Sequence, residues 1–520
     1  MHYIEGQSRT QLQLFNSIDD SIDEDNPVRF MDAFIEGIYR TSPEKLSYKG
    51  KSNVGRKSYH PCTLLKLYLY GYLNRISSSR RLETETYRNI EVKWLLCDLH
   101  PDFKTIADFR KDNKESIRFV TLSFRKFLQE EGYIEGNTLT YDGSKVKACS
   151  SKEKVLTLDR ITRRMLKIEQ QLESYLSELS TNDKAERTED EMAIFLSQND
   201  INKAMMEEIE TLRAQLEELE GFKKQIQESE FSSYCPTDPG AHLMKSRDGF
   251  IPAYNVQTGV DSKNKMIVLA EVIQEGNDLT SIANNCKQTQ EQLGITPAIV
   301  LADAGYGHLS QIEAIESSGE TTCIIPITDC PSKIKEKQHG IKFTYEKESD
   351  SYICSKGKRL KAKKNGRTQH GKTYDIYQAK KADCTHCPLF GKCTTSKNGR
   401  MLKIPQNQSF REQYTKRLET SRSKELIKER KSQIEHVFGT LKRWMGKVPL
   451  LLTSQDKVQT EIDIYTTAYN LRRLLNIERM PLLLAKVANY FSAREESVIM
   501  SYFLVLFCLS PAFIGRIGRV

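Results

Sequence analysis

Apolar residues recur at helical spacing through the first 130 residues of the chain. A polar turn at 25–27 ends in proline, which is typical of a helix start, and the next apolar positions share one face: Phe30, Phe34 and Ile38. Further helices are predicted from His60-Pro61 onward, through Trp94, and over 101–110. Short helices with Arg and Ser at their ends are typical of a helix-turn-helix DNA reader, and the alternative is a helical packing or dimerisation module.

The pattern then changes to a short strand and two long amphipathic segments. Residues 138–142 form the predicted strand. Apolar residues step by three and four through 161–179 and again through 205–219, and a polar run at 181–190 separates them. This spacing predicts two antiparallel coiled-coil arms. The second arm is rich in glutamate, so we do not expect it to lie along a phosphate backbone.

The middle of the chain predicts a mixed sheet. Residues 254–260 alternate, residues 266–270 are apolar, and an asparagine-containing loop separates them, so they are predicted as a hairpin. A helix around 279–293 precedes the uniformly apolar run 298–303, which is typical of a buried central strand. A sheet with helices on its faces gives an α+β fold.

The predicted α+β chain is too long for one domain, because a domain usually takes roughly 100–200 residues and the chain has 520. The predicted N-terminal segment is a helical region at 1–130, and the first part of a sheet-containing core follows at 131–340, with the coiled-coil insertion at 152–230. An irregular, basic, cysteine-containing insertion is predicted at 341–405. The core then continues as a helical part at 406–480, with helices over 409–445 and 465–475, and the chain ends in an apolar tail at 481–520.

Charge is distributed unevenly along the chain. With 38% hydrophobic residues, and 78 Lys and Arg against 69 Asp and Glu for a net charge of +9, the composition excludes a collagen-like fibre and an acidic tail protein. Residues 356–400 hold 13 Lys and Arg and two acids, an excess of +11. We therefore expect a phosphate backbone to lie against this segment.

The two ends of the chain indicate a cytoplasmic protein. Residues 1–6 contain no basic and apolar leader, so no signal peptide is predicted. The 12 cysteines are then expected to be free thiols or metal ligands. The apolar run 498–515 is shorter than about 20 uninterrupted residues and is broken by Pro511, so we expect a docked or loosely packed terminal helix and no membrane partner.

Two aspartates share one local arrangement. Asp142 and Asp303 each end a short apolar strand and are followed by a glycine-containing turn. If the two strands are neighbours in the sheet, both carboxylates project at one edge and can share a divalent cation, which removes their repulsion. Carboxylate oxygens select Mg²⁺ or Mn²⁺. Taken singly, either aspartate is as well explained as a turn cap.

Glu435 supplies a third carboxylate. It lies at the border of the apolar stripe of its predicted helix, which consists of Ile434, Phe438, Leu441 and Met445. A carboxylate there can face the sheet edge, and Lys442 falls on nearly the same face, where it can hold a phosphate. Three such acids suit two metal ions roughly 3.5–4 Å apart that cleave a phosphodiester.

Eight blocks of sequence point to a known family. They are DNPVR at 25–29, YHP at 59–61, LLKLYLYGYLNR at 64–75, FKTIADFR at 103–110, DGSK at 142–145, YNVQT at 254–258, ADAGY at 302–306 and IEHVFGTLKRWMG at 434–446. In these blocks and their order the chain resembles the DDE-type insertion-sequence transposases, in the branch called the eleven-eighty-two group.

The resemblance implies a helical N-terminal DNA-binding domain and an RNase H-like core with a mixed five-stranded sheet. It implies Asp142, Asp303 and Glu435 as the catalytic acids, with Mg²⁺ or Mn²⁺. The implied activity is cleavage at the ends of the element, followed by attack of the freed 3′-hydroxyl on target DNA. The implied partners are double-stranded DNA, as terminal inverted repeats and target, and a second copy in an end-pairing dimer, in association with the bacterial nucleoid.

Basic residues near the acids are candidate DNA phosphate contacts: Lys145, Lys431, Lys442 and Arg443. Lys145 is equally well explained as a solvent-exposed turn residue. Related transposases carry Tyr and Arg before the glutamate and Lys after it. Here Lys428 and Lys431 stand at the first two positions, with Arg430 beside them, whereas the spacing from Glu435 to Lys442 is kept.

Four cysteines lie in the basic insertion between the second and third acids: Cys354, Cys384, Cys387 and Cys393. The spacing from Cys384 to Cys387 is typical of a zinc knuckle, and the other two complete a closed tetrahedral Zn²⁺ site. The alternative is four reduced thiols.

Two other functions remain open on the sequence. A metal-dependent endonuclease with the same core would use water and no 3′-hydroxyl acceptor, and only a strand-transfer product separates it from a transposase. A transposase-derived DNA-binding protein without catalysis is the second, and the presence of all three acids disfavours it.

Overall fold

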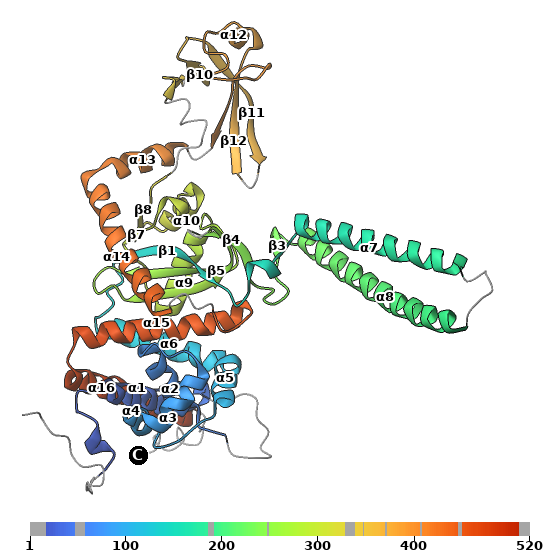
Figure 1. Ribbon diagram of the computed structural model, residues 1–520. Coiled ribbons are helices and arrows are strands. Elements are labelled where there is room, and N and C mark those ends of the chain that lie inside the picture. The colour runs from blue at the N-terminus through green and yellow to red at the C-terminus, as the bar shows by residue number, and fades with distance from the viewer. Residues whose placement is uncertain are drawn as a thin grey trace, which may run out of the picture.

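The computed structural model describes residues 17–46, 58–185, 192–246, 249–327, 338–346, 348–369, 372–405, 408–445 and 450–508. A central sheet separates a body of helices at one end from a small second sheet at the other, and a long pair of helices projects to the side (Figure 1).

The helical body is built by the N-terminal part of the chain: α1 (Pro27–Thr41), α2 (Pro61–Leu73), α3 (Ser79–Arg88), α4 (Ile90–Leu95), α5 (Phe103–Asp112) and α6 (Lys114–Glu130). The predicted helix starts are confirmed. The Asn26 side chain accepts a hydrogen bond from the Val28 amide, and that of His60 accepts one from the Cys62 amide, each with proline in the first turn.

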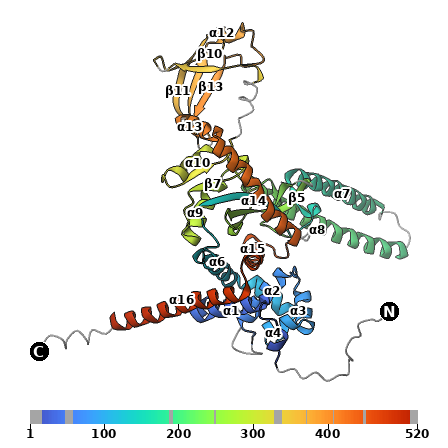
Figure 2. The same cartoon turned by 90° about the vertical axis from the view of Figure 1, so that its left-hand side faces the viewer.

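The last described helix, α16 (Met480–Cys508), packs on this body at its beginning and extends beyond it at its end (Figure 2). The rings of Phe34 and Phe491 lie edge to face with centroids 5.5 Å apart. A Cβ on Gly37 would come within 2.2 Å of the Phe491 ring, so this glycine allows α1 and α16 to approach. The apolar tail is therefore docked over its first turns, and residues 509–520 lie outside the described residues.

The central sheet contains six described strands: β1 (Thr138–Lys147), β4 (His242–Ser246), β5 (Gly249–Asp261), β6 (Ile267–Ile273), β7 (Ile299–Leu301) and β8 (Thr322–Ile324). Their order is β6-β5-β1-β7-β8, and β4 also pairs with β5. β5 runs antiparallel to β1, β4 and β6, whereas β7 is parallel to β1 and β8. The predicted hairpin and the predicted buried strand are confirmed.

Helices cover both faces of this sheet: α9 (Ser281–Leu293), α10 (Leu309–Glu316), α13 (Gln408–Glu419), α14 (Ser421–Met445) and α15 (Gln455–Ile477). Helix α14 crosses one face. Its Leu426 packs with Leu301, and its Val437 packs in a cluster that includes Val256. On the other face, the Tyr141 hydroxyl of β1 lies 2.9 Å from the Thr289 hydroxyl of α9.

Helix α15 completes the hydrogen bonding of β6. The Asn470 amide accepts from the Ile267 N–H at 2.8 Å and donates to the Ile267 carbonyl at 2.9 Å. Gln459 likewise accepts from the Val272 N–H at 2.7 Å and donates to the Ala270 carbonyl at 2.9 Å. Side-chain amides thus replace a neighbouring strand, which satisfies backbone groups that burial would otherwise leave unpaired.

A buried carboxylate joins α15 to the helical body. Arg118 of α6 donates to Asp463 at 2.7 Å and also pairs with Glu271 of β6. Asp463 and Arg125 are both 1% exposed, and Arg125 donates to the Thr466 hydroxyl at 3.2 Å. Burial lowers the pKa of Arg125 to about 10 and raises that of Asp463, while the Arg118 charge opposes the shift at Asp463.

The projecting arm consists of α7 (Leu158–Ala185) and α8 (Met192–Glu228), and the short strands β2 (Leu156–Thr157) and β3 (Ser233–Tyr234) pair at its base. The seam near the base contains Ile161, Leu219 and Ile226. The predicted helical arms are therefore confirmed, and part of the predicted polar connection, residues 186–190, lies outside the described residues.

The second sheet corrects the prediction of an irregular insertion at 341–405. Its strands are β9 (Phe343–Glu346), β10 (Ser351–Cys354), β11 (Arg359–Gln369), β12 (Lys372–Ala379) and β13 (Met401–Pro405), and α12 (Lys381–Thr385) follows β12. The order is β13-β12-β11-β10-β9, antiparallel throughout. Buried Leu360, Tyr377 and Leu402 form a thin core. The many basic residues of this segment obscured the alternation of apolar and polar positions that is typical of strands.

One smaller prediction was also wrong. The central sheet has a sixth strand, because β4 extends the hairpin of β5. The prediction of a helical segment over 409–445 is confirmed, since it forms α13 and α14, which meet at Thr420.

In the described part of the chain, no helix combines the length and the apolar character that a bilayer span requires.

The charge at Asp463 predicts a large loss of stability on substitution. Asp463→Ala leaves the fully buried Arg125 without the nearby charge of Asp463 and removes one of the two carboxylates that pair with Arg118, so the free energy of unfolding should fall by about 3–5 kcal/mol. The control Asp456→Ala removes an exposed carboxylate of the same helix, paired with Lys114, and should cost less than about 1 kcal/mol. Urea unfolding measures both, and equal effects would contradict the role assigned to Asp463.

Candidate active site

The parallel pairing of β1 and β7 brings two predicted acids together. Thr140 lies opposite Leu301, so Asp142 and Asp303 each stand two residues beyond a paired position. Asp303 follows the end of β7, but Asp142 lies inside β1, which continues to Lys147, so the prediction of a strand end and turn at Asp142 was wrong. Each carboxylate accepts a hydrogen bond from a nearby backbone amide. Asp142 accepts from the Gly143 amide at 2.8 Å, and Asp303 accepts from the Gly305 amide at 2.8 Å. The condition under which the sequence predicted a shared edge is therefore met.

The two carboxylates repel each other. Burial raises the pKa of Asp142 to about 6, and the neighbouring charge of Asp303 adds to the shift. The guanidinium of Arg430, on α14, lies 3.7 Å from the Asp142 carboxylate, and its positive charge opposes this rise in pKa. Asp142 thus holds a negative charge at neutral pH at a cost that a cation at this edge would reduce.

The opposite face of the sheet holds a polar network around Asp278. Its carboxylate accepts hydrogen bonds from the side-chain amides of Asn255 and Gln257, each at 2.7 Å, and lies 3.2 Å from the Lys145 ammonium. A Cβ at residue 143 would come within 2.5 Å of Asp278, so a side chain there would displace part of this network. The network lies on the face of β1 opposite to the Asp142 side chain.

Several buried polar atoms on the α14 side lack a hydrogen-bond partner among the described residues. They are the hydroxyls of Ser144 and Thr258 and one guanidinium nitrogen of Arg430. Thr258 lies opposite Asp142 in the β1–β5 register. Unsatisfied polar atoms beside two carboxylates are a feature expected of a ligand site.

Glu435 does not join the pair in this structure. It is exposed on α14, whereas its neighbours Ile434 and Val437 face the sheet and are fully buried. Across the described residues, no group of three or more His, Cys, Asp or Glu is placed to hold a metal ion. The geometry therefore assembles two of the three predicted acids.

The predicted phosphate-contact residues lie in different places. Lys145 faces away from Asp142 and is held by Asp278. Lys431 is exposed, and Arg430, not Lys431, lies at Asp142. Lys442 is exposed with its ammonium 5.8 Å from the centre of the Phe438 ring. The side chain of Arg443 lies outside the described residues.

Arg430 and Asp278 were not assigned a role from the sequence. Arg430 stands one position from the arginine that related transposases carry, and only the rotation of α14 shows which basic side chain meets Asp142. Asp278 follows a glycine and an asparagine and resembles an ordinary loop residue in the sequence. Neither residue type nor spacing distinguishes it.

The four cysteines of the basic insertion line one small cavity of about 30 Å³ in the second sheet. The Arg400 amide donates to the Cys384 sulfur at 3.3 Å. The described residues contain no metal-holding group, so the thiols are gathered without being placed as ligands. The zinc site therefore stays a prediction based on their clustering.

The pKa of Asp142 predicts a pH-dependent effect on stability. An aspartate has a pKa near 3.9 in the unfolded chain, so the destabilisation by its folded-state charge develops as pH rises from about 4 to 6. Asp142→Asn should therefore add about 1–3 kcal/mol to the unfolding free energy at pH 7.5 in EDTA and little at pH 4. Glu429→Gln, at an exposed position of α14, controls for loss of one charge. A larger gain for Asp142→Asn at pH 4 would refute the shift.

The cysteine cavity predicts about one zinc ion per chain in protein purified without chelator. Cys384→Ser should remove it, whereas Cys97→Ser, at an exposed cysteine in the helical body, should leave it. Elemental analysis of the intact chain measures the ratio. Zinc-free protein with four titratable thiols at these positions would establish the alternative of reduced cysteines.

Two segments of the chain match known protein families. Residues 16–112 match the family described as a transposase domain (DUF772), and residues 353–475 match the family described as a transposase DDE domain. The second match contains Glu435 and the four cysteines, whereas Asp142 and Asp303 lie outside both. The comparison with curated proteins gave no match. Together the two matches support an insertion-sequence transposase of the DDE type.

Proposed function

We propose that this chain cleaves DNA at the ends of a bacterial insertion sequence and transfers the freed strand to target DNA. The observation that carries the proposal is the β1–β7 register, which sets Asp142 of β1 level with Asp303 just beyond the end of β7. The strand order β6-β5-β1-β7-β8, with three antiparallel strands followed by two parallel ones, supports an RNase H-like core. The sequence blocks support the eleven-eighty-two group.

A divalent cation fits the Asp142–Asp303 edge. Both residues offer carboxylate oxygens, their charges repel, and a cation between them would relieve the repulsion that raises the Asp142 pKa. Mg²⁺ or Mn²⁺ there would stabilise charge on the scissile phosphate and activate the attacking hydroxyl. Arg430 would hold Asp142 in position through its 3.7 Å contact.

Glu435 is proposed as the third acid, on the strength of the sequence block that contains it. Because it is exposed on α14, it would approach the two aspartates only if α14 turned when DNA and metal bind. Lys442 lies seven residues further on the same helix and would contact a DNA phosphate.

The remaining parts of the chain suggest how DNA is bound. The helical body would recognise the terminal inverted repeats, and the basic second sheet would lie against phosphate backbone. The α7–α8 arm would serve assembly or target contact, within a dimer that pairs the two ends. A location at the nucleoid follows from a DNA substrate.

The proposed chemistry is tested with duplexes that carry the terminal repeats flanking the coding sequence, in Mg²⁺ or Mn²⁺. Asp142→Asn and Asp303→Asn should lower cleavage by about 10³-fold or more while end binding survives. Glu435→Gln should do the same, whereas the matched Glu429→Gln, six residues earlier on α14, should cleave normally.

Three outcomes separate the alternatives. Cleavage by Asp142→Asn would show that the acids are misassigned. Cleavage by the parent without any strand-transfer product would establish an endonuclease. Binding of ends without cleavage by the parent would establish a DNA-binding descendant of a transposase.

A further inference from the structure

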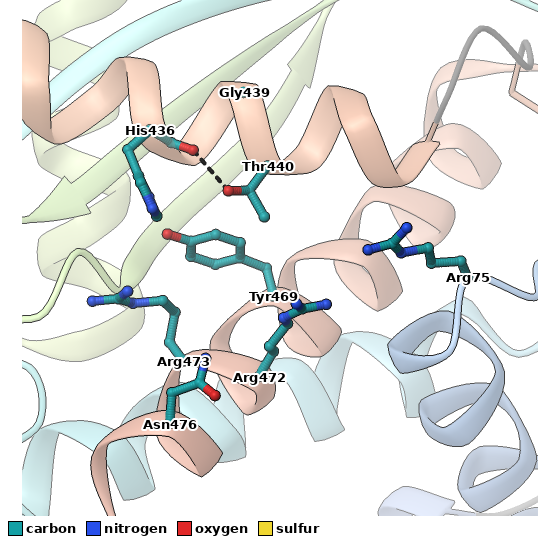
Figure 3. Close-up of a pocket in the computed structure, with 8 residues that line it drawn as sticks. All are labelled: Arg75, His436, Gly439, Thr440, Tyr469, Arg472, Arg473 and Asn476. Carbon is teal, nitrogen blue, oxygen red and sulfur yellow. Dashed lines mark hydrogen bonds between the residues drawn. The ribbon is translucent and has the colours of Figure 1, made fainter.

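A cavity of about 460 Å³ lies between the helical body, α14 and α15. Figure 3 shows its lining: Arg75 from the turn after α2, Arg472 and Arg473 from α15, and His436 from α14 around the ring of Tyr469. The described lining residues include three arginines and a histidine but no aspartate or glutamate. Its size is that of an ordinary ligand site.

The Tyr469 and Thr440 hydroxyls between the arginines form hydrogen bonds within the protein. The Tyr469 hydroxyl donates to the Lys265 carbonyl at 3.1 Å, and the Thr440 hydroxyl donates to the His436 carbonyl at 2.9 Å. Arg473 is anchored by two hydrogen bonds to the Asn264 carbonyl, at 2.9 and 3.1 Å. The cavity therefore offers cationic forks on a rigid wall, which suits an anion with several oxygens.

Arg75 occupies a backbone position that favours glycine. The turn after α2 is closed by hydrogen bonds from Ile76 N–H to Gly71 O at 2.6 Å and from Arg75 N–H to Tyr72 O at 3.2 Å. This is a Schellman motif, and Arg75 has the left-handed φ of +61° that the motif requires. An arginine there costs roughly 1 kcal/mol relative to glycine, so the turn itself does not account for the side chain.

The turn of Arg75 is also held firmly. Arg110 donates to the Tyr72 hydroxyl at 2.7 Å and to the Ser77 carbonyl at 3.0 Å. The Tyr72 ring packs edge to face on Tyr465 of α15, with centroids 4.5 Å apart. The helical body and α15 thus present their arginines to one space in a fixed relation.

We propose that this arginine pocket, formed by Arg75, Arg472 and Arg473, binds a backbone phosphate of the DNA on which the protein acts. The inference rests on the proposed function, because it identifies where that DNA crosses from the helical body to α14. DNA is favoured over a small free phosphate because Arg75 and Arg472 are exposed, so a phosphate that is part of a long duplex can reach them. A phosphate here would be held by two parts of the chain about 400 residues apart in sequence.

The test is binding of a fluorescent duplex of about 30 base pairs to the full chain in EDTA, over about 50–200 mM salt. Arg75→Gly and Arg472→Ala should each weaken binding about 5- to 10-fold at low salt and reduce the salt slope by about 0.9. Arg75→Lys should keep the slope. The control Lys287→Ala removes one positive charge from an exposed position of α9, where it pairs with Glu291, and should change neither quantity.

Folding is controlled by the choice of Arg75→Gly, because glycine relieves the left-handed strain and the melting temperature should be unchanged or higher. Unchanged DNA affinity and slope in both Arg75→Gly and Arg472→Ala would overturn the proposal. Thermal stabilisation by inorganic phosphate that depends on Arg75, without an effect on DNA binding, would overturn the DNA assignment in favour of a small anion. Since no metal or cleavage is involved, the outcome is independent of the Asp142→Asn test.

Discussion

The buried carboxylate of Asp463 is the charge on which contact between the helical body and the central sheet depends. Arg118 of α6 pairs with it, and its charge also stabilises Arg125 of α6, which is 1% exposed. Burial of Arg125 without this nearby carboxylate would be costly. Helix α15, which carries Asp463, also supplies the side-chain amides of Asn470 and Gln459 to the backbone of β6. Helix α15 therefore fixes the sheet and the helical body to each other through polar contacts that allow little change of register.

The candidate active site inherits its geometry from that sheet. The strand order puts β7 beside β1 in parallel, so Asp303, just beyond the end of β7, lies level with Asp142 inside β1. Burial and the charge of Asp303 raise the pKa of Asp142, whereas the charge of Arg430 lowers it. The network of Asp278 on the far face fills the space beside Gly143, so a side chain at this position of β1 would displace it.

The arginine pocket also depends on helix α15. Arg472 and Arg473 follow Asn470 on α15, so the helix that satisfies the β6 backbone also positions two guanidinium groups beside α14. Because Arg75 reaches the pocket from the helical body, an anion bound there would touch both halves of the molecule (Figure 3). The affinity for a phosphate at this point would thus depend on the position of the helical body relative to α14.

The sequence by itself determined the helix starts at Asn26 and His60, the hairpin of β5 and β6, the helical arm, and the strand end before Asp303, because caps, alternation and heptad spacing are local properties. It wrongly ended the first strand at Asp142, because Gly143 is typical of a turn and only the pairing with β5 shows that β1 continues to Lys147. Only the tertiary structure decided that β1 and β7 are neighbours and that Arg430, not Lys431, meets Asp142. It also left Glu435 exposed, since a shift of one residue on a helix turns a side chain by about 100°. Lys145 and Asp278 likewise needed the fold, because their pairing joins residues that no local pattern relates.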